Sequence, residues 1–461
     1  MASPSDRQAV AEQLGRDRLV PFTVVARCSP GHPLVIRNRP TDLEGKPFPT
    51  LYWLTCPQAV AAVSRLESEG WIKSLSDQAD LDPDLGGGLA RAHQEYARDR
   101  GRFHPGAEEW GGVGGAWRGV KCLHAHFANH LAGGPDPIGA WVGERIEARS
   151  LHFEKGARRL AAIDLGTNSI RLLVARFPDE GQELQDLARD MVITRIGQGV
   201  DESKRISSEA LHRTLWVLER YCGRARALGA ERIHLTATSA VRDAKNRREL
   251  GWAVERLTGE PMEVLSGDDE AALTFLGATR SLEAPAPFLV VDIGGGSTEF
   301  VLGHKEPEET ASIDIGSVRL TERFVRNDPP TIDELEAIDR AVTEALTDVE
   351  SRIQVQRAAT LVAVAGTSTT VQAIALGLGE YDPEQLHRSV LSNEDAERVF
   401  RMLADMTTAE RRALPVMAPG REDVIPAGAA ILVAAMRRWS FRQALVSETD
   451  ILDGIAYRMA E

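Results

Sequence analysis

Two short segments of the chain place an aspartate, glycine and hydroxyl side chains in the same order. The first is Asp164-Leu-Gly-Thr-Asn-Ser169 and the second is Asp292-Ile-Gly-Gly-Gly-Ser297. Glycine lets the backbone approach a ligand closely, and exposed amides and hydroxyls donate hydrogen bonds to phosphate oxygens. An adjacent aspartate can hold a hard divalent cation, usually through water. Each segment could therefore bind a phosphate group together with its metal ion.

The two segments belong to an internal repeat. Asp164 and Asp292, Gly166 and Gly294, and Ser169 and Ser297 are each 128 residues apart. One Asp-Gly turn alone would indicate only a hairpin, but a duplicate at matched spacing predicts two related hairpins that grip one phosphate chain. The predicted phosphate contacts in these hairpins are Thr167, Asn168, Ser169, Gly294, Gly295, Gly296, Ser297 and Thr298.

The elements that must position these hairpins follow an α/β pattern after residue 159. Apolar runs typical of strands alternate with amphipathic stretches typical of helices. The expected strands are 160–165, 170–176, 233–236, 288–293, 298–303 and 361–365, and the expected helices are 207–228, 331–353 and 421–438. We predict two homologous halves around a cleft, 159–284 and 285–461, with the terminal helix packing back on the first half.

The first 150 residues have a different character. Apart from a predicted helix near 57–69, periodicity is weak, and glycine-rich breaks occur at 86–88, 111–115 and 133–134. We interpret residues 1–150 as a small α+β domain with long loops. The basic, polar stretch 144–159 is the predicted linker.

Composition excludes several classes of protein. The chain has 461 residues, 43% of them hydrophobic and 26% charged, which is ordinary for a globular protein. No apolar run approaches the roughly 20 residues that span a bilayer, the N-terminus lacks a signal-peptide pattern, and four cysteines fit a reducing cytoplasm. A net charge of −14 makes nucleic acid an unsuitable partner. An anionic substrate would need arginines, amides or a bound cation to hold it.

Residues 159–461 resemble the Ppx/GppA phosphatase family. The resemblance rests on the two aspartate-glycine segments together with Thr238-Ser-Ala-Val-Arg242, Ser266-Gly-Asp-Asp-Glu-Ala271 and the closing stretch 447–457, in order. It implies the actin, Hsp70 and sugar-kinase fold, which is ribonuclease H-like in each half. It also implies a cytoplasmic enzyme, usually a homodimer, that hydrolyses phosphoanhydride bonds.

The resemblance assigns roles to a few positions. Glu270 would be the base that orients the attacking water, and we place Glu299 beside it as the second catalytic carboxylate. Asp164 and Asp292 would hold Mg²⁺ and its waters. Arg242 would bind the terminal phosphate through its planar guanidinium. Asp269 stands where the family usually has glutamate, which is a departure outside the proposed base.

The predicted function is Mg²⁺-dependent removal of terminal phosphate from inorganic polyphosphate. The alternative is a guanosine pentaphosphate (pppGpp) 5′-phosphohydrolase, because both substrates present a terminal phosphoanhydride to the same cradle. A small-molecule kinase and a chaperone-like nucleotide switch are further alternatives. The kinase would need an acceptor pocket, for which residues 159–461 leave little chain.

Residues 20–147 resemble an actinobacterial domain-of-unknown-function family, numbered 501, through Val25-Ala-Arg-Cys28 and Val120-Lys-Cys-Leu-His-Ala-His126. The fusion implies a partner or regulatory role. The stretch 121–131 predicts a short helix ended by Gly133, with Cys122 and His126 on one face. These two side chains could bind zinc, with Cys28 as a third ligand. A catalytic Cys–His pair and a purely structural cluster are the alternatives.

Overall fold

The computed structural model describes residues 2–16, 18–28, 31–42, 44–48, 50–147, 158–177 and 184–460. Within these residues no helix combines the length and apolar character that crossing a membrane requires. The predicted linker 144–159 begins inside helix α6 (Pro137–Glu147) and ends in strand β4 (Arg158–Leu165). Its central residues lie outside the described part of the chain.

Packing divides the chain into two compact units. Unit 1 comprises residues 1–161, 173–190 and 218–233, and unit 2 comprises 162–172, 191–217 and 234–461. The N-terminal domain belongs to unit 1. All of the predicted phosphate, metal and catalytic residues from Asp164 onward belong to unit 2, so that site lies within one unit.

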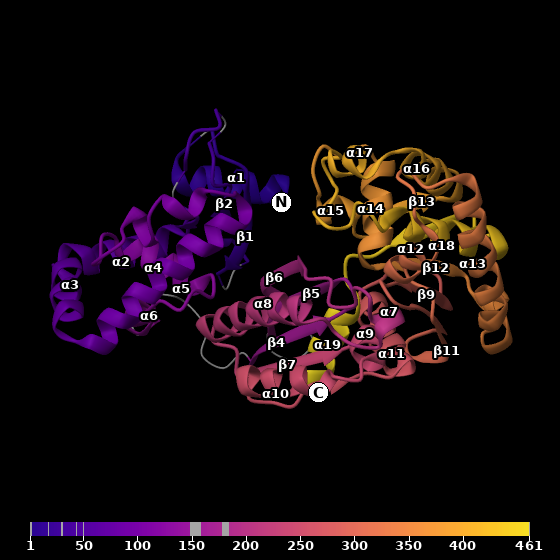
Figure 1. Ribbon diagram of the computed structural model, residues 1–461, viewed down its shortest axis with the longest axis horizontal. Coiled ribbons are helices and arrows are strands. Elements are labelled where there is room, and N and C mark those ends of the chain that lie inside the picture. Colours follow the sequence, from indigo (N-terminus) through magenta and orange to yellow (C-terminus); the bar gives the residue numbers. More distant parts are fainter. Residues whose placement is uncertain are drawn as a thin grey trace. The chain divides into compact units, whose positions relative to one another are not determined.

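The N-terminal domain is α+β, as predicted (Figure 1). Its antiparallel sheet has the order β1-β2-β3. Helix α1 packs on β2, and α5 packs on β3. The predicted helix near 57–69 corresponds to α2. The elements besides α6 are α1 (Pro4–Leu14), β1 (Phe22–Arg27), β2 (Pro33–Asn38), β3 (Tyr52–Leu54), α2 (Pro57–Ser68), α3 (Trp71–Leu81), α4 (Pro83–Phe103) and α5 (Leu123–Leu131).

The predicted break at residues 86–88 is wrong, because these glycines lie inside helix α4. Asp82 caps that helix by accepting hydrogen bonds from two amides of its first turn, and Pro83 has the φ that a first helical position needs. A Cβ on Gly86 would lie 2.5 Å from the carbonyl oxygen of Ala79 in α3. Glycine in this helix therefore serves close packing between helices and does not interrupt the helix.

Within unit 1 the N-terminal domain packs against the last turns of helix α8 (Ser208–Ala227). Arg220 of α8 lies 3.0 Å from the carboxylate of Asp99 and donates to the hydroxyl of Tyr52 at 3.1 Å. Tyr52 in turn donates to Asp99. All three side chains are buried, so this contact is a charge-balanced polar network in which each ionised group has a partner.

Two mixed sheets follow the N-terminal domain, as the alternating pattern predicted. The five-stranded sheet has the order β6-β5-β4-β7-β8, and the six-stranded sheet has the order β11-β10-β9-β12-β14-β13. The strands besides β4 are β5 (Ser169–Phe177), β6 (Gln185–Ile193), β7 (Arg232–Ala237), β8 (Glu263–Val264), β9 (Phe288–Ile293), β10 (Thr298–Gly303), β11 (Pro307–Ile313), β12 (Thr360–Val364), β13 (Val390–Ser392) and β14 (Gln443–Val446). The predicted strands agree with these bounds within two residues.

The helices of this region lie between or after those strands. The predicted helices 207–228 and 331–353 correspond to α8 and α13. The predicted helix 421–438 corresponds to α18, which begins only at Ile425 and has Pro426 in its first turn. The helices are α7 (Val200–Ser203), α9 (Ser239–Asp243), α10 (Arg247–Thr258), α11 (Gly267–Thr279), α12 (Ser317–Phe324), α13 (Ile332–Arg352), α14 (Ala365–Ala375), α15 (Pro383–Leu386), α16 (Asn393–Asp405), α17 (Thr408–Arg412), α18 (Ile425–Arg438) and α19 (Ile451–Ala460).

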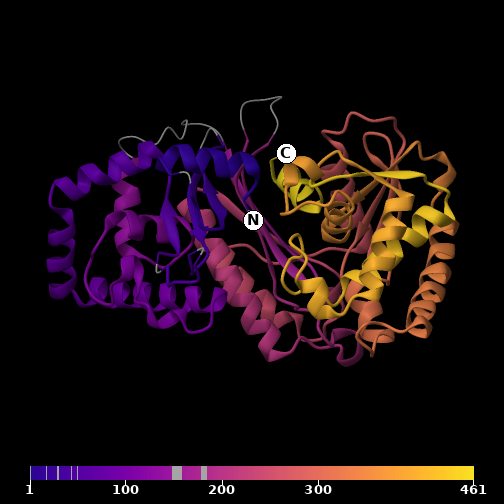
Figure 2. The ribbon, with the colours of Figure 1, turned by 90° about the horizontal axis from the view of Figure 1, so that it is seen from above.

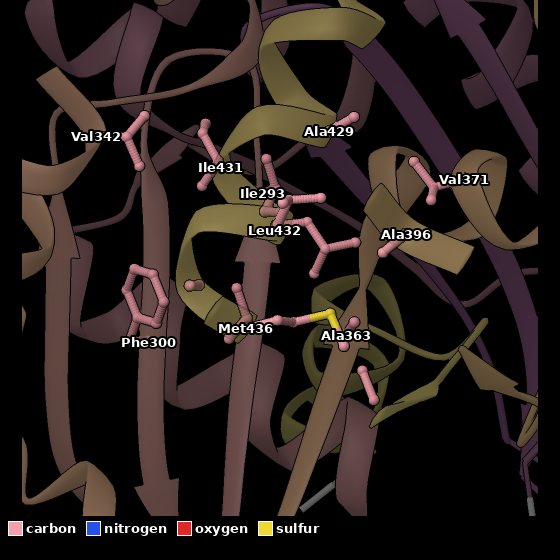
Figure 3. Close-up of a cluster of buried hydrophobic side chains, with 14 of the residues drawn as sticks. Ile293, Phe300, Val342, Ala363, Val371, Ala396, Ala429, Ile431, Leu432 and Met436 are labelled. Atoms are coloured by element: carbon pink, nitrogen blue, oxygen red, sulfur yellow. The ribbon is translucent and has the colours of Figure 1, made fainter. Parts of the chain in front are cut away.

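A large apolar core supports the six-stranded sheet. Helices α13 and α18 pack against each other, and both appear beside the sheet as neighbouring orange and yellow helices in Figure 2. Figure 3 shows side chains of this core from strands β9, β10 and β12 and from helices α13, α14, α16 and α18. Ile293 and Phe300, at the two sides of the second aspartate-glycine turn, are 2% and 0% exposed. The turn is therefore held on a rigid base.

Helix α19, the last helix, packs closely against α11. A Cβ on Gly277 would lie 1.8 Å from the carbonyl oxygen of Asp450, and one on Gly454 would lie 1.9 Å from that of Leu273. The two helices can approach this closely only because both crossing positions are glycine. This contact brings Asp450, at the start of α19, next to the first aspartate-glycine segment.

Candidate active site

Both aspartate-glycine segments form the same backbone turn. The amide of Gly166 donates to the carbonyl of Ser169 at 3.0 Å, and the amide of Gly294 donates to the carbonyl of Ser297 at 3.1 Å. Strands β9 and β10 pair as an antiparallel hairpin with Glu299 opposite Asp292, and β4 and β5 are neighbours in the other sheet. The predicted duplication of the hairpin is confirmed. We call the two turns loop 1 (residues 164–171) and loop 2 (residues 292–299).

The loops turn their carbonyl groups away and leave their amides free. In loop 1 the carbonyls of Thr167 and Asn168 accept amides of residues 194, 195 and 197. In loop 2 the carbonyls of Gly294 and Gly295 accept amides from the start of α12. The amides of residues 167–169 and 295–297 donate to no acceptor within the described chain. Unpaired amides of this kind form an anion-binding concavity.

Five carboxylates lie in these loops or next to them, and all of them are buried. They are Asp164, Glu270, Asp292, Glu299 and Asp450. Two arginines contact the group. Arg171 binds Asp164 at 2.6 Å and also contacts Asp450, and Arg242 lies 3.4 Å from Glu270. The acidic groups outnumber their basic partners, which differs from the balanced network around Arg220.

This excess of acid changes the protonation of the cluster. Burial, followed by the charges of Glu299 and Asp450, raises the pKa of Asp292 to about 8. Burial raises the pKa of Glu299 to about 7, although hydrogen bonds from Ser297 and Ser312 oppose the rise. Burial and the other carboxylates also raise the pKa of Glu270 well above its ordinary value. The cluster therefore needs protons or a cation to be stable at neutral pH.

Glu270 occupies a fixed position at the start of α11. Ser266 caps this helix by accepting the amide of Asp269 at 3.1 Å, which makes Glu270 part of the first helical turn. Arg242 donates to the carbonyl of Leu265 at 2.8 Å and faces Glu270 with the same nitrogen. The guanidinium thus holds the predicted base while its remaining N–H groups stay available for an anion.

The donor set fits a divalent cation. Oδ1 of Asp164 is buried without a hydrogen-bond partner, while Oδ2 accepts from Arg171. In Asp292, Oδ2 accepts only a long hydrogen bond of 3.3 Å from Thr274. These five carboxylates do not place oxygens of any three residues within 4.8 Å of one another. Mg²⁺ suits such a site, because it keeps several of its waters and takes few direct carboxylate ligands.

A pocket of about 250 Å³ borders both loops. Thr167 and Gly296 line it, and the hydroxyl of Thr167 lies 2.9 Å from that of Ser239. Arg319 forms another wall, where Nε donates to the carbonyl of Gly296 and the guanidinium pairs with Asp201 and Asp243. None of the five carboxylates lines this pocket, so it borders the tips of the loops and is not the space beside the acidic cluster.

The structure brings most of the predicted residues together, but the hydroxyl of one predicted phosphate contact, Thr298, is not free. The side chain of Thr298 donates to the carbonyl of Ile315 at 2.7 Å, so its hydroxyl is already engaged. Two residues of this cluster were absent from the predicted site, Arg171 and Asp450. Arg171 stands at the position of loop 1 that Glu299 occupies in loop 2, 128 residues later. This difference in charge between matching positions of the repeat could have identified Arg171 as a residue of the site.

The predicted zinc ligands are not brought together. Cys122 precedes helix α5 with an extended backbone (φ −156°), so helical spacing does not relate it to His126. His126 is buried and binds Asp136 at 2.8 Å. Cys28 lies beside Cys56, whose pKa is lowered to about 6 by the hydrogen bond between the two thiols. Gly133 adopts a positive φ of +88° just after α5, in agreement with the predicted helix end.

Comparisons with known proteins agree with this geometry. Residues 173–461 match the Ppx/GppA phosphatase family, and residues 24–144 match a protein family of unknown function, DUF501. Exopolyphosphatase 2 of Mycobacterium tuberculosis is 44% identical over 318 residues, which cover 66% of this chain and 98% of the relative.

Solved structures give the same result. The Ppx/GppA family member of Aquifex aeolicus is 30% identical with a TM-score of 0.57, and covers 66% of this chain and 98% of its own. An exopolyphosphatase from Cytophaga hutchinsonii is 27% identical with a TM-score of 0.61, and covers 66% and 97%. The predicted actin-like α/β architecture is thereby confirmed for residues 159–461. The chain belongs to the Ppx/GppA phosphatase family.

Proposed function

We propose that this chain is an exopolyphosphatase that removes the terminal phosphate of inorganic polyphosphate with the help of Mg²⁺. The observation that carries the proposal is the pair of loops with free amides beside a buried, acid-rich cluster. Free amides suit phosphate oxygens, and excess carboxylates suit the cation that accompanies them. The relative from M. tuberculosis, named an exopolyphosphatase, supports the choice of substrate.

The residues of the chain divide the work. The amides of residues 167–169 and 295–297 bind the oxygens of the phosphate chain, and Arg242 binds the terminal phosphate. Glu270 accepts a proton from a water, whose oxygen attacks the terminal phosphorus while the bond to the bridging oxygen breaks. Glu299 lies in the same cluster and holds the solvent around the cation.

Asp164 and Asp292 would hold Mg²⁺, mostly through its waters, with the unpaired Oδ1 of Asp164 as one acceptor. The cation, when bound, supplies positive charge that shields the phosphates from the carboxylates. Lysine or further arginine is therefore not required inside the cluster.

In a kinase of this fold, Gly366 and Thr367 could face the adenosine of a nucleotide, but Arg421 packs against Gly366 here. A Cβ on Gly366 would lie 2.2 Å from Nη2 of Arg421, and Arg421 donates to the carbonyl of Gly366 at 3.0 Å. This packing favours a hydrolase over a kinase, because an adenosine would have to displace the partly buried guanidinium of Arg421.

Phosphate release from three substrates tests the proposal. The full-length protein is assayed with long polyphosphate, short polyphosphate and guanosine pentaphosphate at matched phosphate-end concentration, each with Mg²⁺ and with EDTA. We expect Mg²⁺-dependent release that is fastest from polyphosphate. Faster release from guanosine pentaphosphate would replace the proposed substrate, and equal release in EDTA would refute the metal.

The N-terminal domain, residues 1–150, is in our proposal an accessory domain of a cytoplasmic homodimer. The support for its accessory role is that the predicted site residues all follow Asp164. Light scattering of the purified protein tests the dimer. A folded but inactive chain of residues 155–461 would instead place part of the active site in the first domain.

A further inference from the structure

A second group of metal-ligand side chains lies in the N-terminal domain, between helices α2 and α5. Glu67, Cys122 and His124 each offer one donor atom, and the three atoms lie within 4.8 Å of one another. Within the described residues no other trio of histidine, cysteine or acidic groups meets this condition. The trio is formed by the end of one helix and the start of another, so the fold and not one local motif assembles it.

The separations match those of a tetrahedral metal site. Sγ of Cys122 is 3.9 Å from Nδ1 of His124, and Nδ1 is 3.2 Å from Oε1 of Glu67. Zinc bond lengths of about 2.3 Å to sulfur and about 2.0–2.2 Å to nitrogen and oxygen give tetrahedral edges of roughly 3.6 Å and 3.4 Å. Small side-chain movements would bring all three donors to one ion.

The histidine is oriented for this role by its second nitrogen. Nε2 of His124 lies 3.1 Å from the carbonyl oxygen of Val60 and 3.2 Å from the hydroxyl of Ser64. A carbonyl only accepts hydrogen bonds, so Nε2 carries a proton. In the neutral ring Nδ1 then presents its lone pair toward Cys122 and Glu67, which is the arrangement that metal-binding histidines adopt.

Glu67 is also held in place. Its Oε1 accepts the amide of Leu123, in the first turn of α5, at 2.7 Å.

We propose that Glu67, Cys122 and His124 bind a zinc ion whose fourth position is open to water. A thiolate and an imidazole favour Zn²⁺ over Mg²⁺, which prefers oxygen ligands. The side chains of His124 and Glu67 are 23% and 25% exposed, so solvent reaches the site. Three protein ligands and one water form an open site, unlike the closed four-ligand sites that only stabilise a fold.

Cobalt substitution tests this site in the full-length protein. After treatment with chelator, the protein is titrated with Co²⁺, and a thiolate-to-cobalt charge-transfer band is followed in the near ultraviolet. We expect one equivalent to produce the band, and Zn²⁺ to abolish it. A cation bound only by the carboxylates of the active site gives no thiolate band. The band therefore tests the zinc site independently of the proposed exopolyphosphatase activity.

Variants locate the ion. Cys122→Ser should remove the band, and His124→Gln or Glu67→Gln should weaken Co²⁺ binding by at least about 10-fold, the effect of losing even an outer partner. Glu67→Gln keeps an oxygen for the amide of Leu123, which makes it the conservative test. Cys222→Ser and Cys28→Ser are the matched cysteine controls and should retain the band.

Two results would overturn the proposal. One is the absence of a thiolate band in the wild-type protein, and the other is a band that survives Cys122→Ser. Loss of the band in Cys28→Ser alone would move the metal to Cys28 and Cys56 and would equally refute it. Circular dichroism melts identify any variant that has lost its fold, in which case the remaining variants decide.

Discussion

Loop 1 and loop 2 have the same backbone and opposite charge chemistry. Each has an aspartate at its start, the same turn hydrogen bond and three free amides. Seven residues after the aspartate, loop 1 carries Arg171 and loop 2 carries Glu299. Arg171 compensates Asp164 directly, whereas Asp292 faces a second carboxylate across the hairpin. The two loops thus share one backbone turn, and the residue at this one position makes loop 2 the more acidic side.

The contrast bears on the Mg²⁺ that we propose for this site. Asp164 is paired with Arg171 at 2.6 Å, whereas Asp292 forms no direct ion pair within the described residues and accepts a long hydrogen bond from Thr274. A charge left unpaired in a buried site is costly unless it is protonated or binds a metal. In the proposed mechanism, the cation would neutralise the acidic side of the repeat.

The largest expected effect comes from making loop 2 resemble loop 1. In Glu299→Arg the new guanidinium should pair with Asp292 and replace the cation. Phosphate release with Mg²⁺ should fall by about 10³-fold or more, since a metal supplies several kcal/mol of charge stabilisation. Glu299→Gln, which keeps the shape without the positive charge, is the control and should lose less. If the two folded variants lost the same amount of phosphate release, the charge at position 299 would not be what distinguishes loop 2 from loop 1.

Removal of either aspartate should raise the requirement for Mg²⁺. Asp164→Ala and Asp292→Ala each delete one carboxylate of the proposed site, so half-maximal activity should need at least about 10-fold more Mg²⁺, if any activity remains. The Mg²⁺ requirement should rise more for Asp292→Ala than for Asp164→Ala, because one oxygen of Asp164 already accepts a hydrogen bond from Arg171. Titration of phosphate release with Mg²⁺ measures both. An unchanged Mg²⁺ requirement in both variants would remove these residues from the site.

The pH dependence of stability gives a smaller effect. Without a divalent cation, Asp292 and Glu299 have pKa values of about 8 and about 7, above their ordinary values near 4. The folded state then binds more protons than the unfolded state, so stability present at acidic pH is lost as pH rises through 7 and 8. Mg²⁺ should therefore raise the melting temperature more at pH 9 than at pH 6, by on the order of several degrees.

Thermal melts at both pH values, with and without Mg²⁺, check this expectation. The variant Asp292→Asn with Glu299→Gln cannot take up these two protons, so its Mg²⁺ effect should depend less on pH, with Glu270 among the remaining carboxyl groups of raised pKa. A pH-independent Mg²⁺ effect in the wild-type protein would mean that the two carboxyl groups do not exchange protons for the cation.

Both hairpins could be predicted from the sequence, because each is defined by neighbouring residues: two apolar strands joined by an Asp-Gly turn. Asp450 could not be inferred in the same way. It reaches Arg171 across 279 residues of sequence, through the glycine crossing of α11 and α19. The break predicted at residues 86–88 was wrong for a related reason, because glycines of α4 serve contacts with other elements, such as that of Gly86 with α3. Cys122 was placed on a helical face, but its extended backbone turns its thiol toward His124 instead of His126.

The most direct test of the account is the turnover of Glu270→Gln on polyphosphate in the full-length protein. Glutamine keeps the shape of the side chain and its contact with Arg242 but cannot accept the proton of the attacking water. We predict that kcat falls by about 10²–10⁴-fold, the usual contribution of a positioned general base, with little change in KM. A folded Glu270→Gln protein with near-normal kcat would contradict the assignment and make Glu299 the candidate base.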